Sequence, residues 1–167
     1  MTTARLRLGI CCLFVGLATV PAGATLTIDP PQGWKPLDVS AMVVRLEAAW
    51  AAPASDDFAQ NITLLKEAAP GLTLDDYVKL SEKQLHKTYQ DVVLSLDQTE
   101  KCGAVSMQHL KYNAPFGSHM LSLEQILVPD SGSFYVVTYT RLVNQPELPE
   151  ASQALLTACN HLSGSTA

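Results

Sequence analysis

The spacing of apolar residues predicts an antiparallel meander in the second half of the chain. Three apolar runs, residues 104–112, 120–128 and 133–141, are separated by turn-forming segments at residues 113–118 and 129–132. Apolar runs bounded so closely by Gly, Pro, Asn and Asp are typical of strands joined by hairpins. We therefore expect this stretch to form the larger part of one sheet.

Shorter strand patterns precede the meander. Residues 43–50 alternate between an apolar and a mixed face, which is typical of a half-buried strand. Residues 26–29, 58–65 and 91–96 are bounded by turn residues, and we interpret them as strands as well. Residues 97–101 are polar throughout, and we expect them to connect the last of these strands to the meander.

Two helices are predicted by apolar residues at helical spacing. The first begins after Thr73, which forms an approximate capping box with Asp76, and its apolar stripe extends to Tyr89. The second begins near Pro149. Three strands, a helix, four strands and a helix indicate an α+β fold, with an antiparallel sheet of about six to seven strands and helices packed on it.

The first 24 residues have the pattern of a cleaved secretory signal peptide. Arg5 and Arg7 form a positive region, residues 8–20 are apolar, and residues 22–24 are a small-x-small cleavage site that ends at Ala24. The apolar part is shorter than the roughly 20 residues that cross a bilayer, and no later apolar run is longer. We therefore expect cleavage after Ala24 and a periplasmic or secreted protein without a transmembrane segment.

The remaining chain is expected to form one domain over residues 25–163, with a frayed tail at residues 164–167. A lipoprotein signal at Cys11 or Cys12 is disfavoured, because Ile10 stands where such signals have a small residue. Cleavage would leave 9 basic residues against 16 acidic ones, a net charge of −7. Nucleic acids and anionic lipid surfaces need a basic face, so neither is expected as a partner.

Two cysteines, Cys102 and Cys159, would remain after cleavage. In an oxidising compartment this number favours a disulfide, which would tie the start of the meander to the last helix. Two buried thiols are the alternative. No Cys-x-x-Cys pair is present for redox catalysis.

No catalytic or metal-binding motif is present in the sequence. The histidines (His86, His109, His119 and His161) lack metal-site spacing, and there is no nucleophile elbow, phosphate-binding glycine loop or zinc cysteine set. We therefore expect no cofactor and no metal. His109 and Glu124 are expected to face each other on adjacent strands. We interpret them as a solvent-facing pair, and a small hydrolase that uses both residues is the alternative.

Several aromatic residues are candidates for the core or for a ligand groove: Trp34, Trp50, Tyr112, Phe134, Tyr135 and Tyr139. Clefts for apolar ligands are commonly lined by aromatic side chains. A candidate ligand or partner surface is therefore formed by Trp34, Trp50, Tyr112, Tyr135 and Tyr139, beside the plainer interpretation that they fill the core.

Short motifs extend over nearly the whole mature chain. They are IDPPQGW at residues 28–34, FAQNI at 58–62, LTLDDY at 72–77, GAVS at 103–106 followed by Tyr112, and YVVT at 135–138. Together they resemble the PsbP-like family, which includes the DcrB-type and LpqN-type bacterial envelope proteins. Because these are packing and turn residues, the resemblance is more specific for fold than for function, and it implies an α/β/α sandwich.

The resemblance implies a non-catalytic protein, such as an extrinsic photosystem subunit, a phage-entry factor, a lipid-trafficking partner or a secretion chaperone. It offers no shared catalytic residue, and the paired cysteines are not part of the family pattern. We therefore expect a non-enzymatic periplasmic or secreted binding or accessory protein that contacts an envelope protein or a lipid-like ligand. The alternatives are an accessory or immunity-type partner of a secretion or toxin system, and the hydrolase named above.

Overall fold

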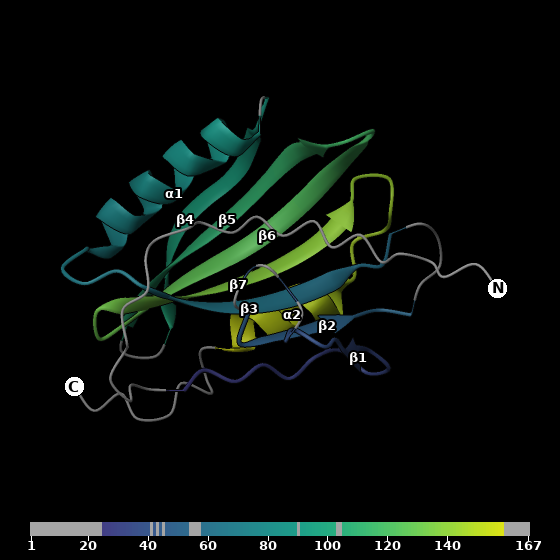
Figure 1. Ribbon diagram of the computed structural model, residues 1–167, viewed down its shortest axis with the longest axis horizontal. Helices are drawn as coiled ribbons and strands as arrows, with labels where there is room; N and C mark the ends of the chain where they lie inside the picture. The colour runs from purple at the N-terminus through teal and green to yellow at the C-terminus, as the bar shows by residue number, and fades with distance from the viewer. Residues whose placement is uncertain are drawn as a thin grey trace.

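The computed structural model describes residues 25–158, apart from 41, 43, 45, 54–57, 90, 103 and 104. Over these residues the chain forms a seven-stranded sheet and two helices (Figure 1). In chain order these are β1 (Lys35–Pro36), β2 (Ala48–Ala51), β3 (Asn61–Ala68), α1 (Leu74–Thr88), β4 (Val93–Cys102), β5 (Val105–Phe116), β6 (His119–Asp130), β7 (Ser133–Leu142) and α2 (Pro149–Ala158). Neither helix of this described part is long and apolar enough to cross a membrane.

All neighbouring strands are antiparallel, in the order β1-β2-β3-β7-β6-β5-β4. The predicted meander is confirmed as β5, β6 and β7. Ser131 and Gly132 turn the chain between β6 and β7, and both have positive φ, 37° and 82°. Two-residue turns of this kind match the right-handed twist of the strands that they join. The segment predicted to be a signal peptide, Cys159 and the C-terminal residues lie outside the described residues.

The two helices pack on opposite faces of the sheet. Side chains of adjacent strand residues alternate between the faces, so Phe134 packs in the core cluster with α1 while Tyr135 packs in the cluster with α2. Helix α1 contacts β5 and β6, and α2 contacts β6 and β7 (Figure 1). We call the two sides of the sheet the α1 face and the α2 face.

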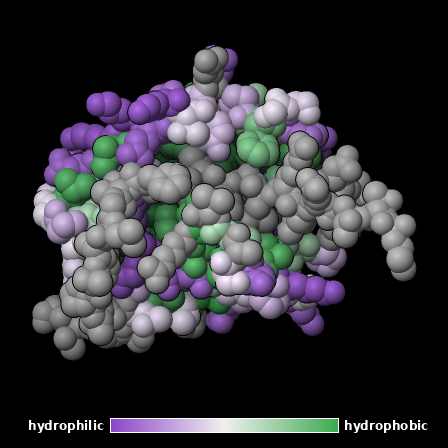
Figure 2. Space-filling view, viewed as in Figure 1, coloured by the Kyte–Doolittle hydropathy of each residue, from purple (hydrophilic) through white to green (hydrophobic). Residues whose placement is uncertain are grey.

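The first helix is confirmed, with its predicted capping box. The Thr73 hydroxyl accepts a hydrogen bond from the Asp76 N–H, and the Asp76 carboxylate accepts one from the Thr73 N–H. Tyr77 lies on the buried side of α1, and its ring stacks on Phe134 with 4.0 Å between the centroids. The outer side of α1 is hydrophilic, as Figure 2 shows at the upper left. The helix therefore has one packing side and one solvated side.

The predicted strand at residues 26–29 is wrong. Leu26 and Ile28 are buried in the core of the α2 face, but the segment that contains them lies outside the strands. Alternating apolar residues place their side chains in the core whether or not the backbone pairs, so the pattern cannot separate the two cases. The first strand is instead β1, a two-residue segment that carries no such pattern.

Two other boundaries also differ from the prediction. Residues 97–101 do not form a connection but continue β4 to Cys102. They are polar because β4 is an edge strand, in which most residues are exposed. Within residues 43–50, the described strand begins only at Ala48. Strand β3 begins at Asn61 and ends at Ala68, three residues later at each end than predicted.

Leu155 provides a test of the packing between α2 and the sheet. Its side chain is fully buried, so Leu155→Ala removes apolar contacts and leaves a cavity. We expect the free energy of unfolding to fall by about 2–5 kcal/mol, measured by urea denaturation. Gln153→Ala, an exposed change on the same helix, is the matched control. Equal stability of the two variants would contradict the packing described here.

Candidate functional site

The α2 face contains a polar cluster with a buried centre, which we call the Glu124 cluster. Its members are Glu100 on β4, His109 and Lys111 on β5, Glu124 on β6 and Ser152 on α2. His109 and Lys111 share a face because they are two residues apart on one strand. Lys111 is directly opposite Glu124, and His109, whose direct partner is Ile126, is diagonal to it.

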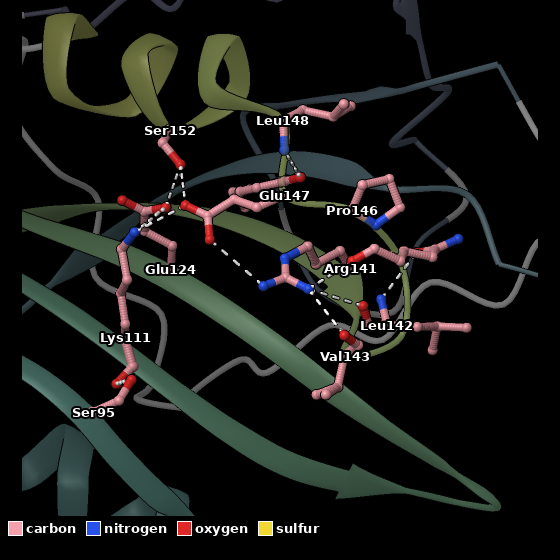
Figure 3. Close-up of polar contacts among 12 residues, drawn as sticks. Ser95, Lys111, Glu124, Arg141, Leu142, Val143, Pro146, Glu147, Leu148 and Ser152 are labelled. Atoms are coloured by element: carbon pink, nitrogen blue, oxygen red, sulfur yellow. Dashed lines mark hydrogen bonds and ion pairs between the residues drawn. The ribbon is translucent and has the colours of Figure 1, made fainter.

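Glu124 is the centre of this cluster. One carboxylate oxygen, Oε1, accepts a hydrogen bond from His109 Nε2 at 2.8 Å. The other, Oε2, accepts one from the Ser152 hydroxyl at 2.6 Å and lies 3.2 Å from Lys111 Nζ. In Figure 3, Lys111 extends from the sheet and Ser152 from the helix toward this carboxylate. The contacts engage both oxygens from two layers of the fold.

His109 lies between two carboxylates. Its Nδ1 is 2.8 Å from Glu100 Oε1, while its Nε2 faces Glu124. Because ring nitrogens that both face carboxylates are both donors, the geometry favours the imidazolium form. The hydrogen bond to Glu124 raises the pKa of His109, with Glu100 adding to the effect, and burial opposes it.

Burial alone would raise the pKa of Glu124. The hydrogen bonds from His109 and Ser152 and the nearby charge of Lys111 outweigh it, so the pKa of Glu124 is lowered. Burial also disfavours the charged form of Lys111, but Glu124 and Glu147 raise its pKa overall. The cluster is therefore a set of compensated charges under α2.

The ion pairs continue to the connection between β7 and α2. Glu147 lies 3.1 Å from Lys111 Nζ and 3.6 Å from a guanidinium nitrogen of Arg141. The same guanidinium group donates to the carbonyls of Leu142, Val143 and Gln145, as Figure 3 shows in part. Arg141 thus fixes the loop that places α2 over Glu124.

The interpretation of His109 and Glu124 as a solvent-facing pair is wrong. Their predicted proximity is confirmed, but each residue is only 5% exposed, because the centre of the cluster is buried in the α2 face. In the described part the Ser152 hydroxyl donates to Glu124, and the hydrogen-bond partners of His109 are the carboxylates of Glu100 and Glu124, so Ser152 and His109 are not paired with each other. The same part contains no group of three or more His, Cys, Asp or Glu residues that could hold a metal.

Three residues of the cluster were missed at the level of sequence: Glu100, Lys111 and Ser152. Lys111 could have been found, because it follows His109 by two residues and so shares its face. Glu100 was placed in a connecting segment instead of a strand. Ser152 has no sequence signal, since its role depends on how α2 docks on the sheet.

The candidate aromatic surface is divided between the two faces. Tyr112 is buried on the α1 face, whereas Tyr135 and Tyr139 are buried on the α2 face. Trp34 and Trp50 are partly buried against that same α2-face core. The Tyr139 hydroxyl donates to Gln60 at 2.5 Å and accepts from the Leu148 N–H at 3.2 Å. Of the five residues, therefore, only Trp34 and Trp50 still present surface for the predicted contact.

The disulfide between Cys102 and Cys159 stays a prediction. Cys102 is the last residue of β4, and Cys159 lies outside the described residues.

Three exposed apolar residues, Val93, Met120 and Val143, and the half-buried Pro115 lie on the α2 face at one end of the sheet. Met120, at the start of β6, is directly opposite Pro115 of β5, and its carbonyl accepts from the Val143 N–H at 2.9 Å. Val93 of β4 is paired with Asn113, two residues before Pro115. We call Val93, Pro115, Met120 and Val143 the apolar row. The turn between β5 and β6 lies at the upper right of Figure 1.

No protein-family model and no curated protein matches the chain. Among matching solved structures is LpqN, involved in cell envelope biogenesis of Mycobacterium tuberculosis, with 15% identity and a TM-score of 0.56; the match covers 86% of this chain and 82% of LpqN. Another is PA94 of Pseudomonas aeruginosa, a protein of unknown function and putative regulator, with 16% identity and a TM-score of 0.61. That match covers 87% of this chain and 100% of PA94. At such identities the likeness shows the fold alone, so the PsbP-like assignment stays a prediction.

The electrostatics of His109 predict a pH dependence of stability. The pKa of His109 in the folded protein is raised above the ordinary 6.5. Its contribution to stability is therefore fully present below about pH 6.5 and is lost as the pH rises through the folded pKa. The pH dependence from Glu124 runs in the opposite direction. Its contribution to stability is fully present above about pH 4.5 and is lost as the pH falls through its lowered pKa. We expect His109→Gln to destabilise the protein more at about pH 5.5 than at about pH 9.

Urea denaturation of His109→Gln and the parent protein at both pH values measures this difference. His119→Gln, which changes an exposed histidine, is the control. A loss of stability that is the same at both pH values would contradict the ion-pair geometry of His109.

Ser152 tests whether the cluster holds α2 on the sheet. Ser152→Ala removes a hydrogen bond to a buried carboxylate, so we expect a loss of about 2 kcal/mol in the free energy of unfolding. In a double-mutant cycle the same change in a Glu124→Gln background should cost clearly less, because the charged acceptor is absent. An equal loss in both backgrounds would show that Ser152 acts independently of Glu124.

Proposed function

We propose that this chain is an exported, non-catalytic accessory protein of the bacterial envelope, and that it contacts a protein partner through the apolar row. The observation that carries the proposal is the exposure of three large apolar side chains in one place. Val93 is 59% exposed, Met120 43% and Val143 45%. Single exposed apolar residues are ordinary, but several of them at one end of the same sheet face, with the backbones of Met120 and Val143 hydrogen-bonded to each other, favour a contact surface.

The surroundings of the row favour a protein partner. Asn113, Ser122 and Arg141 are opposite one another on β5, β6 and β7. They are in register with Val93 and lie next to Pro115, Met120 and Val143 on the sheet. An apolar centre with a polar margin is the usual composition of a protein interface. A net charge of −7 after the expected cleavage also disfavours an anionic membrane surface.

Two further observations support a role without catalysis in the envelope. His109 and Glu124, at the centre of the Glu124 cluster, are buried and paired with each other and with their neighbours, so they are poorly placed to receive a substrate. The first 24 residues have the pattern of a secretory signal. LpqN, which shares the fold, is involved in cell envelope biogenesis, and we extend that setting to this chain.

Site-specific photo-crosslinking in the native host tests this proposal. A photoreactive phenylalanine analogue at Met120 should give a discrete covalent adduct to another protein in the envelope fraction. The same analogue at Lys83, an exposed position of α1, should not give that adduct. Adducts from neither position, or the same adducts from both, would overturn the proposal.

A second variant separates loss of contact from loss of fold. Val143→Asp places a charge beside Met120 at an exposed position, so the melting temperature should change little. The adduct from position 120 should nevertheless fall at least about fivefold, because an apolar interface does not accept an unpaired charge. An undiminished adduct would show that the partner does not use the apolar row.

A further inference from the structure

The two edges of the sheet are very different. β1 forms one edge, has only two residues and contains Pro36, so it offers little free backbone for pairing. Short edge strands and proline are common protections against pairing with another chain. β4 forms the opposite edge, has ten residues and contains no proline. Its free side is therefore a long row of backbone donors and acceptors.

Within the part of the chain that the structure describes, no strand pairs with the outer side of β4, and this edge is regular over most of its length. From Val93 to Lys101 no residue of the strand is buried. A bulge interrupts its pairing with β5 between Leu94 and Leu96, and from Leu96 to Cys102 the ladder is continuous. Bulges and charges also protect edges, but here the bulge is confined to one end and the charges have both signs.

We propose that β4 pairs antiparallel with β4 of a second copy of this chain, centred on Thr99, to form a homodimer with a continuous sheet. In this register Asp97 of each copy is directly opposite Lys101 of the other, and Gln98 is opposite Glu100. Opposite charges at directly facing positions stabilise a strand pair. The paired segment runs from Leu96, opposite Cys102, through the regular part of the strand.

Symmetry excludes most other registers. Directly opposite side chains project from the same face of a sheet, and side chains along one strand alternate between the faces. In a two-fold antiparallel pair of identical strands, the axis must therefore pass beside a residue and not between two residues. A centre at Asp97, Glu100 or Lys101 places two like charges together. A centre at Gln98 pairs Asp97 with Thr99 and opposes no unlike charges. Of these five centres, only Thr99 places a negative side chain opposite a positive one, and it does so twice, once on each side of the two-fold axis.

The side chains at three of the facing positions are hydrogen-bonded to β5, the strand on the inner side of β4. Asp97 accepts a hydrogen bond from Gln108, Thr99 donates to the same Gln108 at 2.9 Å, and Lys101 donates to Ser106 at 3.1 Å. All three therefore project from the same face of the sheet, as facing partners must.

A cysteine at the centre of the register gives a sharp test. In Thr99→Cys the two new thiols face each other across the axis, at the Cα separation of about 4.5–5.5 Å of opposite residues, which a disulfide can span. Ser95→Cys is the matched control, because its two copies would be about 27 Å apart along the strand. We expect mild oxidation to give a covalent dimer with Thr99→Cys, and none with Ser95→Cys or the parent protein.

The charge pairs give an independent test in solution. Lys101→Asp should weaken dimerisation about tenfold, measured by native mass spectrometry and light scattering over a concentration series. The exchanged variant Asp97→Lys/Lys101→Asp should restore it, since the opposite charges then face each other again. Melting temperatures monitor the fold of each variant.

A parent protein that stays monomeric at about 100 μM would overturn the proposal, and so would equal cross-linking at positions 95 and 99. If the protein dimerises but Lys101→Asp and the exchanged variant both bind as tightly as the parent protein, the Thr99-centred register is wrong.

Discussion

The structure depends on the pairing of β3 with β7. Eight residue pairs, from Asn61 opposite Thr140 to Ala68 opposite Ser133, insert the first half of the chain beside the last strand of the meander. β1 and β2 join the sheet only through β3. The chain then leaves β3 for α1, whose Tyr77 hydroxyl returns to Glu67 of β3 at 2.5 Å while its ring stacks on β7. Burial raises the pKa of Glu67, which favours a neutral carboxyl in this contact. One long-range ladder thus fixes the strand order and the position of the first helix.

The second constraint is the burial of charge on the α2 face. Removing a carboxylate from water is costly unless its charge and its hydrogen-bonding capacity are met by partners. Glu124 meets this condition with groups from two elements, His109 and Lys111 from β5 and Ser152 from α2. Because a shift of α2 would leave this carboxylate without one of its donors, the cluster specifies where the helix sits. A packed apolar interface alone would define the position less sharply, since it tolerates small displacements.

The fold was largely predictable because its central strands carry strong local signals. The meander has apolar runs and Gly or Pro turns, and α1 has both a capping box and an apolar stripe. The failures have a physical cause. Residues 97–101 are polar because an edge strand has solvent on both sides, and Leu26 and Ile28 alternate like a strand although their backbone does not join the sheet. For the site, strand alternation brought His109 near Glu124, but burial by α2 is a tertiary effect that no local pattern encodes.

The contrast between the buried charges and the exposed edge of the sheet also applies to the proposed contacts. The charges of the Glu124 cluster are paired with one another, so the contacts proposed above are assigned to surfaces that the described part of the fold leaves exposed. Two such surfaces share β4: Val93 belongs to the apolar row, and the regular edge begins after the bulge at Leu96. A pair of β4 strands centred on Thr99 would use Leu96 to Cys102 and leave Val93 outside the paired segment. Because the two-fold axis places the two copies of Val93 at opposite ends of the paired segment, a dimer would present two separate apolar rows. The bulge therefore divides one strand into a segment suited to self-pairing and a segment free to contact a different protein.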